Sequence, residues 1–329
     1  MTRACLRSFL VVLLVLLAMP AALVAEIVAT PKDNLQEVFA RADKSREDVL
    51  LTAGEYGVKE PLKTNSTIRA ERGVALRWQG SPAKKDAPQQ FILSLSSEGG
   101  GWGSPAIDGR LLLDCAGKIG GLSIDDVHDV KVSGVYIHNS AGCGLSVTRA
   151  WFLHLATIRV AYGTGAAIRV DGLSNGSMKG IVVGDHKAGV DVLMTINAGA
   201  ARLENICAER CSSDRAILDL VASTSTLSQW SSENLEAPVL IRLHDSRMPT
   251  LQDLSFWQPE GLPSQIEVLV ERCIEPRVDG LSTYNCRDAA LRFSGCVNPR
   301  HSRVVRYYDT IGKPEYGVRP KYLVDVRPL

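Results

Sequence analysis

The sequence has no excess of charge of either sign. Its 37 lysine and arginine residues are balanced by 36 aspartate and glutamate residues. It therefore lacks the positive charge with which nucleic-acid-binding proteins neutralise phosphates, and we expect no nucleic acid among its partners.

The sequence also lacks the residue spacings of a zinc site. Its six histidines, at 128, 138, 154, 186, 244 and 301, are scattered, and no second pair of ligands lies near Cys207 and Cys211. We expect buried structural thiols or a local disulfide there instead.

A long apolar run occurs near the amino terminus. Arg3 and Arg7 precede an apolar stretch from Phe9 to Met19, and Ala25 offers a small residue before a cut ahead of Glu26. This pattern predicts a signal peptide over residues 1–25, with an uncleaved membrane anchor as the alternative. We expect a secreted or periplasmic protein that meets a membrane only through the cleaved segment.

The main feature of the sequence is a repeat of 23 to 27 residues. Two apolar residues, three positions apart, recur seven times, as Val132/Val135, Leu155/Ile158, Met178/Ile181, Leu203/Ile206, Leu227/Trp230, Leu251/Leu254 and Val278/Leu281. A fixed period of this size is typical of a solenoid, in which each unit buries its apolar face against the next.

A second set of pairs alternates with the first and predicts short strands with one buried face. Its members are Leu145/Val147, Ile168/Val170, Val190/Val192, Leu218/Leu220, Ile241/Leu243, Ile266/Val268 and Leu291/Phe293. Turn residues such as Asp171-Gly172 and Asn175-Gly176 link the strands. No repeat has room for a helix of ten residues, and the sequence lacks the leucine framework of a leucine-rich repeat, so a parallel β-helix is favoured.

The amino-terminal order of elements resembles a known family. Asp33 and Asn34 can cap a helix with the apolar face Leu35, Val38, Phe39 and Ala42, and the strand at 49–51 is followed by Ala53-Gly54-Glu55-Tyr56. This resembles the opening of the pectate-lyase-like right-handed parallel β-helix superfamily, over roughly residues 33 to 310. The resemblance implies an all-β, right-handed parallel β-helix solenoid of about nine coils with an N-terminal capping helix.

We expect four segments in this order. They are a signal peptide at 1–25, the capping helix at 26–45, a β-helix at 46–310 with an insertion at 81–118, and a capping tail at 311–329 rich in proline and tyrosine. Trp102 lies in the insertion, where it can serve as a sugar-stacking platform or as an aromatic anchor for the loop.

Polar residues alternate with the apolar residues of the predicted strands. They form one outward column of mixed charge: Ser146, Arg169, Asp191, Asp219, Arg242, Glu267 and Arg292. This column predicts either ion pairing across a solvated sheet or a groove in which arginines hold an anionic polysaccharide.

The candidate site gathers acids, bases and cations on three consecutive repeats. Its catalytic candidates are Asp185, His186, Asp191, Asp214, Arg215 and Asp219; its substrate-binding candidates are Arg169, Arg242, His244, Arg247 and Trp102. In a hydrolase, Asp191 and Asp219 would form the carboxyl pair. In a lyase, Arg215 or His186 would accept the proton and the aspartates would hold Ca²⁺. The alternative is a set of turn residues and surface ion pairs.

The resemblance identifies the scaffold and leaves the reaction open. The polygalacturonase motifs Asn-Thr-Asp, Gly-Asp-Asp, Gly-His-Gly and Arg-Ile-Lys are not matched, and only Asp185 could be carried over to this sequence. We expect a secreted protein that binds polysaccharide, an acidic one among the candidates. As an enzyme it would be a polysaccharide lyase or a glycoside hydrolase. The alternative is a non-catalytic cell-envelope or adhesion solenoid.

The cysteines allow one specific expectation. Without Cys5 of the signal segment, seven of the eight cysteines remain, so at least one thiol stays free. Cys273 and Cys296 are one repeat apart and could form a disulfide across adjacent coils.

Overall fold

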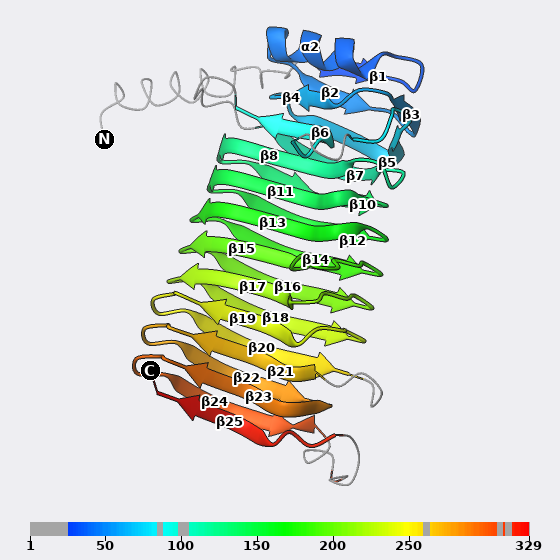
Figure 1. Ribbon diagram of the computed structural model, residues 1–329. Helices are drawn as coiled ribbons and strands as arrows, with labels where there is room; N and C mark the ends of the chain where they lie inside the picture. Colours follow the sequence, from blue (N-terminus) through cyan, green and yellow to red (C-terminus); the bar gives the residue numbers. More distant parts are fainter. Residues whose placement is uncertain are drawn as a thin grey trace, which may run out of the picture.

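The structure is a computed structural model, and it describes residues 26–83, 88–97, 105–258, 264–307, 312 and 318–328. These residues form two long sheets in which every strand pair is parallel. From β4 onward the chain passes back and forth between the two sheets, so the backbone winds as a solenoid whose coils stack along one axis (Figure 1).

The sheet that starts the solenoid has fourteen described strands and is called sheet A. Its strands are β1 (Glu26–Ala29), β2 (Asp48–Leu51), β3 (Gly54–Val58), β5 (Ile68–Trp78), β7 (Ala106–Asp114), β9 (Lys131–Ser133), β10 (Val135–His138), β12 (His154–Ala161), β14 (Ser177–Gly184), β16 (Arg202–Glu209), β18 (Thr226–Glu233), β20 (Thr250–Trp257), β22 (Arg277–Thr283) and β24 (Arg300–Arg306).

The facing sheet has eleven described strands and is called sheet B. Its strands are β4 (Leu62–Thr64), β6 (Phe91–Ser96), β8 (Gly120–His128), β11 (Ala141–Trp151), β13 (Thr164–Ser174), β15 (Met194–Gly199), β17 (Ala216–Ser223), β19 (Val239–His244), β21 (Ser264–Glu271), β23 (Cys286–Ser294) and β25 (Tyr322–Arg327). Because each coil contributes one strand to sheet B, the solenoid has about eleven coils rather than nine. The expected count fell short because the clearest sequence repeat covers only residues 132–281.

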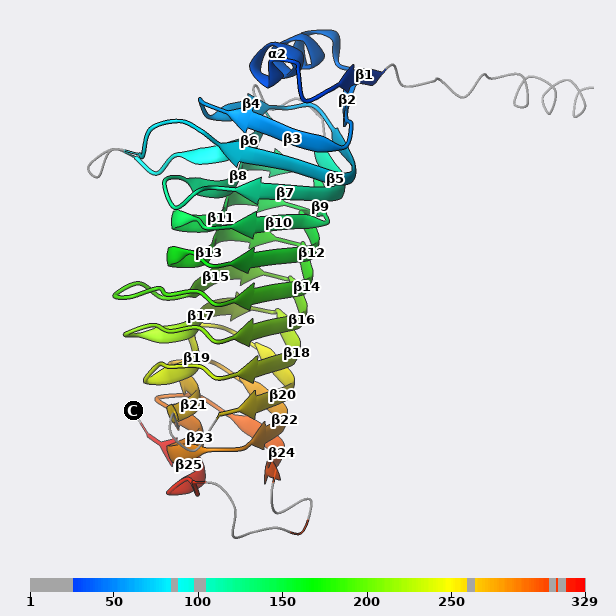
Figure 2. The ribbon, with the colours of Figure 1, turned by 90° about the vertical axis from the view of Figure 1, so that its right-hand side faces the viewer.

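One helix, α2 (Leu35–Ser45), lies over the amino-terminal end of the solenoid (Figure 2). The side chain of Asn34 caps it by accepting a hydrogen bond from the backbone N–H of Gln36. Its buried residues are Leu35, Val38, Phe39 and Ala42, as the apolar pattern predicts. The capping helix is therefore confirmed, although it begins at Leu35 rather than at 26, where the chain forms β1. It covers apolar surface that the first coil would otherwise expose.

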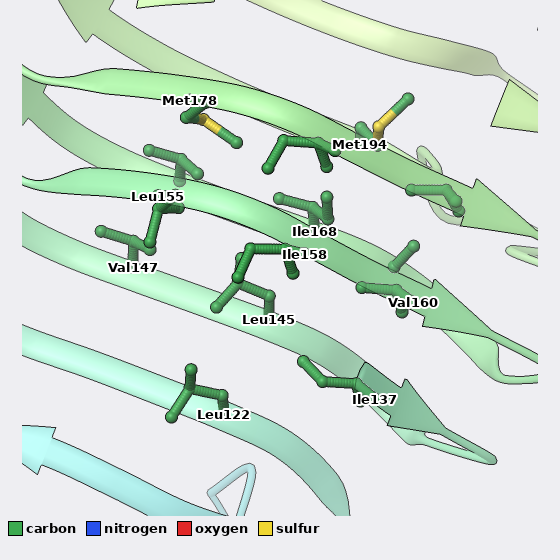
Figure 3. Packing of buried hydrophobic residues seen from close by; sticks show 14 of the residues in the cluster. Leu122, Ile137, Leu145, Val147, Leu155, Ile158, Val160, Ile168, Met178 and Met194 are labelled. Atoms are coloured by element: carbon green, nitrogen blue, oxygen red, sulfur yellow. The ribbon is translucent and has the colours of Figure 1, made fainter. Parts of the chain in front are cut away.

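The first set of apolar pairs is confirmed in register and in burial. Leu155, Met178, Leu203, Leu227, Leu251 and Val278 are neighbours on successive strands of sheet A. Their partners three positions later stack in the same way, and members of both columns are at most 2% exposed. Figure 3 shows Leu155, Ile158 and Met178 packed in the interior with residues of sheet B.

A left-handed residue explains how two residues three positions apart can both point inward. In a regular strand such residues face opposite sides. The residue before the second member of each pair has a positive φ, including Thr157 at 56° and Gly180 at 65°. One such residue turns the strand and returns the next side chain to the core. Every one of the seven pairs has this feature.

The second set of pairs is confirmed at five positions and wrong at two. The inward pair on β15 is Met194/Ile196, and Val190 lies in the preceding turn with 77% of its surface exposed. The inward pair on β21 is Val268/Val270 rather than Ile266/Val268. Alternation alone cannot find the start of a strand, because a turn can alternate in the same way.

This shift changes two members of the outward column. Thr195 takes the place of Asp191, and Leu269 takes the place of Glu267. Glu267 is instead fully buried and accepts a hydrogen bond from Thr283 Oγ1 at 2.8 Å. Burial raises the pKa of this carboxyl well above its usual value.

Candidate functional site on the outer face of sheet B

Two columns of outward side chains cross the middle of sheet B. The first column contains Ser146, Arg169, Thr195, Asp219 and Arg242, one from each of β11, β13, β15, β17 and β19. The second column, two residues further along each strand, contains Thr148, Asp171, Asn197, Val221 and His244. The two-residue period of a strand brings both columns to the same face.

These columns enclose a groove of about 380 Å³ that crosses four coils. The residues that line it are Arg169, Val170, Asp171, Thr195, Ile196, Asn197, Asp219, Val221 and His244. The middle coils carry the short side chains of Thr195, Asn197 and Val221. These lie between the longer side chains of Arg169 and His244 on the flanking coils, which leaves a groove. This volume lies within the roughly 300–1,000 Å³ typical of ligand sites.

His244 lies between two carboxylates at one end of the groove. Its Nε2 is 3.0 Å from Asp219 Oδ1, and its Nδ1 is 2.8 Å from Asp245 Oδ2. Asp219 Oδ1 is buried, and no hydrogen bond of good alignment reaches it from the described residues. Asp245 also receives two bonds of 2.8 Å from Arg272, which with His244 hold its pKa far below the usual value.

The arginines of the first column have carboxylate partners. Arg169 Nη2 is 3.2 Å from Asp191 Oδ1, and Arg242 Nε donates to Glu271 Oε2 at 2.7 Å. Asp191 therefore lies outside the groove lining and neutralises Arg169 from the turn before β15. Asp191 and Asp219 do not both line the groove as the predicted hydrolase pair would require.

The other predicted catalytic residues lie on turns that join sheet A to sheet B. Figure 2 shows the turns after β14 and β16, which project from one edge of the solenoid. Asp185 is bound by Arg210 Nε and Nη2 at 2.6 and 2.8 Å, and these bonds lower the pKa of its carboxyl. Asp214 and Arg215 are exposed and precede β17. None of these three residues lines the groove.

His186 is a core residue rather than a surface base. Its side chain is fully buried, and Nε2 donates to the carbonyl oxygen of Gly165 at 3.0 Å. Burial lowers the pKa of the imidazole to about 4. Nδ1 has no hydrogen-bond partner among the described residues. A substrate on the surface cannot reach this ring.

Of the remaining substrate-binding candidates, His244 lines the groove, whereas Arg247 lies on the turn after β19. Trp102 lies outside the described residues. Within 81–118, β6 and β7 are regular strands of sheets B and A. Four further residues line the groove without being sequence-predicted site residues: Asp171, Thr195, Asn197 and Val221. The dipeptide Asp171-Gly172 is typical of a turn in sequence, but it lies within β13, where Gly172 adopts a positive φ at a bulge.

The described residues contain no group of three or more histidine, cysteine, aspartate or glutamate side chains placed to hold a metal ion. The calcium expected for a lyase stays a prediction. Among the same residues, no helix is both long enough and apolar enough to cross a membrane.

Among the comparisons with known proteins, only those with solved structures bear on the fold. No protein-family model matches the sequence. No curated protein matches it either. Among solved structures, the mannuronan C-5 epimerase AlgE6 A-module of Azotobacter vinelandii has a TM-score of 0.59 and 12% identity, over 83% of this chain and 94% of that chain.

Two further structures are similar. The AlgE4 A-module of the same organism has a TM-score of 0.53 and 10% identity, over 94% of this chain and 98% of that chain. The enzymatically active domain of tailspike protein 2 of bacteriophage CBA120 has a TM-score of 0.54 and 7% identity, over 85% of this chain and 52% of that chain. The chain thus has the right-handed parallel β-helix fold that these structures share.

Proposed function

We propose that this protein binds a polysaccharide chain in the groove on sheet B. The groove itself carries the proposal, because it combines a cavity of about 380 Å³ with polar side chains that converge on it. Asp171, Thr195 and Asn197 supply acceptors and donors for sugar hydroxyls, and Val221 supplies an apolar contact. Asn197 Nδ2 already donates to Asp171 Oδ1 at 3.3 Å, which holds both side chains in place.

The similar structures support a polysaccharide as the ligand class. Two of them are named for an activity on mannuronan. At 12% identity or less they share the fold with this chain, so the ligand class is a proposal that rests on the groove. We also propose export, since residues 1–25 have the pattern of a signal peptide. Amino-terminal sequencing of the exported protein should begin at Glu26.

A second candidate function is catalysis at Asp219 and His244. The observation that favours it is that Asp219 and His244 both line the groove, with His244 Nε2 only 3.0 Å from Asp219 Oδ1. Such a pair can exchange a proton with a bound sugar. A polysaccharide lyase or a glycoside hydrolase would use it, whereas an adhesion or envelope protein would bind sugar without products.

The test is binding to a panel of immobilised polymannuronate, polygalacturonate and α-1,3-glucan, followed by substitution in the groove. Thr195→Tyr should fill the groove and abolish retention on the polymer that the wild type binds. Ser228→Tyr, at an outward position of sheet A, is the matched control and should bind like the wild type. Equal binding by wild type and Thr195→Tyr would contradict the proposed site.

A further inference from the structure

A third outward column borders the groove, at the carboxyl-terminal edge of sheet B. Its members pair in register on five successive strands: His128, Trp151, Ser174, Gly199 and Ser223. Gly199 and Ser223 lie two residues beyond Asn197 and Val221, which line the groove. The ends of β13, β15 and β17 stack along this edge (Figure 1).

Trp151 presents a large aromatic surface at the start of this edge. It is 56% exposed, and the adjacent Phe152 is 42% exposed. The His128 ring lies 6.3 Å from the Trp151 ring and 5.4 Å from the Phe152 ring, centre to centre, and supports both from the preceding coil. Two neighbouring exposed aromatic rings are a common sign of a binding surface.

The surface between Trp151 and the middle of the groove is open. Ser174 occupies the position beside Trp151 on the next coil. A Cβ atom at Gly199 would meet no heavy atom within 4 Å apart from those of its two neighbours in the chain. A ligand that occupies the groove can therefore extend over these residues to reach the tryptophan.

An arginine without a carboxylate partner lies at the other end of the edge. The backbone N–H of Arg247 donates to Ser223 Oγ at 3.2 Å, so Arg247 continues the column on the next coil. Its side chain is exposed. The nearby carboxylates Asp219 and Asp245 pair with His244 and Arg272, and no ion pair joins the Arg247 guanidinium to a carboxylate of the described residues. Arg169 and Arg242, by contrast, are already neutralised.

Building on the proposed polysaccharide binding, we propose that Trp151 and Arg247 are the two end contacts for an acidic polysaccharide. One sugar ring stacks on Trp151, and a carboxylate further along the chain pairs with Arg247. The two residues are four coils apart, which corresponds to about 19 Å at the spacing of neighbouring strands. The polymer therefore runs parallel to the solenoid axis, alongside Asn197 and Val221.

The experiment measures the affinity of the full chain for polymannuronate, with α-1,3-glucan as the neutral probe. Trp151→Ala should weaken binding of polymannuronate roughly tenfold, as for an aromatic anchor, and Trp151→Phe should restore most of it. Arg247→Gln should weaken polymannuronate binding and flatten its dependence on salt. It should leave any binding of the glucan unchanged, because the glucan carries no carboxylate.

Gly199→Leu tests whether the polysaccharide crosses the surface between Trp151 and Arg247, because it blocks that surface without removing either end contact. Because the site is open and Gly199 has an ordinary backbone conformation, the variant should fold and should lose polymannuronate binding. Ser228→Leu on sheet A is the control. A melting temperature equal to that of the wild type confirms folding of each variant.

The outcomes separate this inference from the proposed function. If the wild type binds no polymer of the panel, the proposed function is overturned. If Thr195→Tyr abolishes polymannuronate binding while Trp151→Ala, Gly199→Leu and Arg247→Gln bind like the wild type, only the end contacts are wrong. Loss of binding in these three variants, with both Ser228 controls intact, supports the inference.

Discussion

Asp219 Oδ1 lies 3.0 Å from His244 Nε2, although 25 residues separate the two side chains in the sequence. They meet because β17 and β19 are neighbours in sheet B, with Leu220 paired to Leu243. The pair lies at the end of the groove and is the one acid–base contact among its lining residues.

If the protein is an enzyme, its activity should depend on this pair. Asp219→Asn should lower the rate by roughly 100-fold or more, because it removes one group of a proton-transferring pair. Product absorbance in the ultraviolet identifies a lyase, and new reducing ends identify a hydrolase. Asp214→Asn, on an exposed turn, is the control. An unchanged rate in Asp219→Asn would place catalysis elsewhere.

The apolar columns should not tolerate charge. Ile181 is fully buried in sheet A, so Ile181→Asp should lower the free energy of unfolding by about 4 kcal/mol or more. Val182→Asp places the same carboxylate on the outer face of the same strand and should cost about 1 kcal/mol or less. Chemical denaturation of both variants measures the difference. Similar losses in both would contradict the register.

His186 should make the fold sensitive to acid. Its pKa in the folded protein is about 4, below the usual 6.5, so its contribution to stability is complete above pH 6.5 and is lost as the pH falls toward 4. The loss amounts to about 3 kcal/mol. Denaturation at pH 7 and pH 4.5 should show a smaller pH dependence in His186→Asn than in the wild type. An equal pH dependence in the two proteins would mean that folding does not lower the pKa of the His186 ring.

Glu267 should make the folded protein less stable as the pH rises, which is the opposite of the effect of His186. Its pKa is raised in the folded protein, so its contribution is complete below the usual pKa of 4.5 and is lost as the pH rises toward the folded value. Glu267→Gln keeps an oxygen for Thr283 and removes the charge. We expect the variant to match the wild type near pH 4 and to melt at a higher temperature at pH 8. A lower melting temperature at pH 8 would contradict this.

Cys273 and Cys296 should be each other's partner under oxidising conditions. The structure shows both as free thiols. The bridge between Ile274 and Val297 places the preceding cysteines at equivalent positions on successive coils, where their Cα atoms can lie within the roughly 7 Å that a disulfide allows. Non-reducing peptide mapping after oxidation should recover the two peptides joined. Recovery of either cysteine joined to Cys115 would exclude the pairing.

The solenoid fold of this protein can be predicted from its sequence. The paired apolar residues define a solenoid because every coil must bury the same face, and Ile181 is inward for the same reason as Ile158. The helix cap at Asn34 can also be predicted from the sequence, because a cap depends only on neighbouring backbone groups.

The residues that line the groove depend on contacts between coils and could not be predicted from the sequence. The strand boundary that placed Thr195 rather than Asp191 in the groove depends on pairing with β13 and β17, which the alternation of one segment does not encode. Residue type alone made His186 a candidate base, whereas the neighbouring coils bury it. The sequence around Trp151, the proposed end contact, carries no local signal of ligand binding. The place of Trp151 beside the groove follows from the register of the coils, in which Ser174, Gly199 and Ser223 continue its column across the next three strands of sheet B.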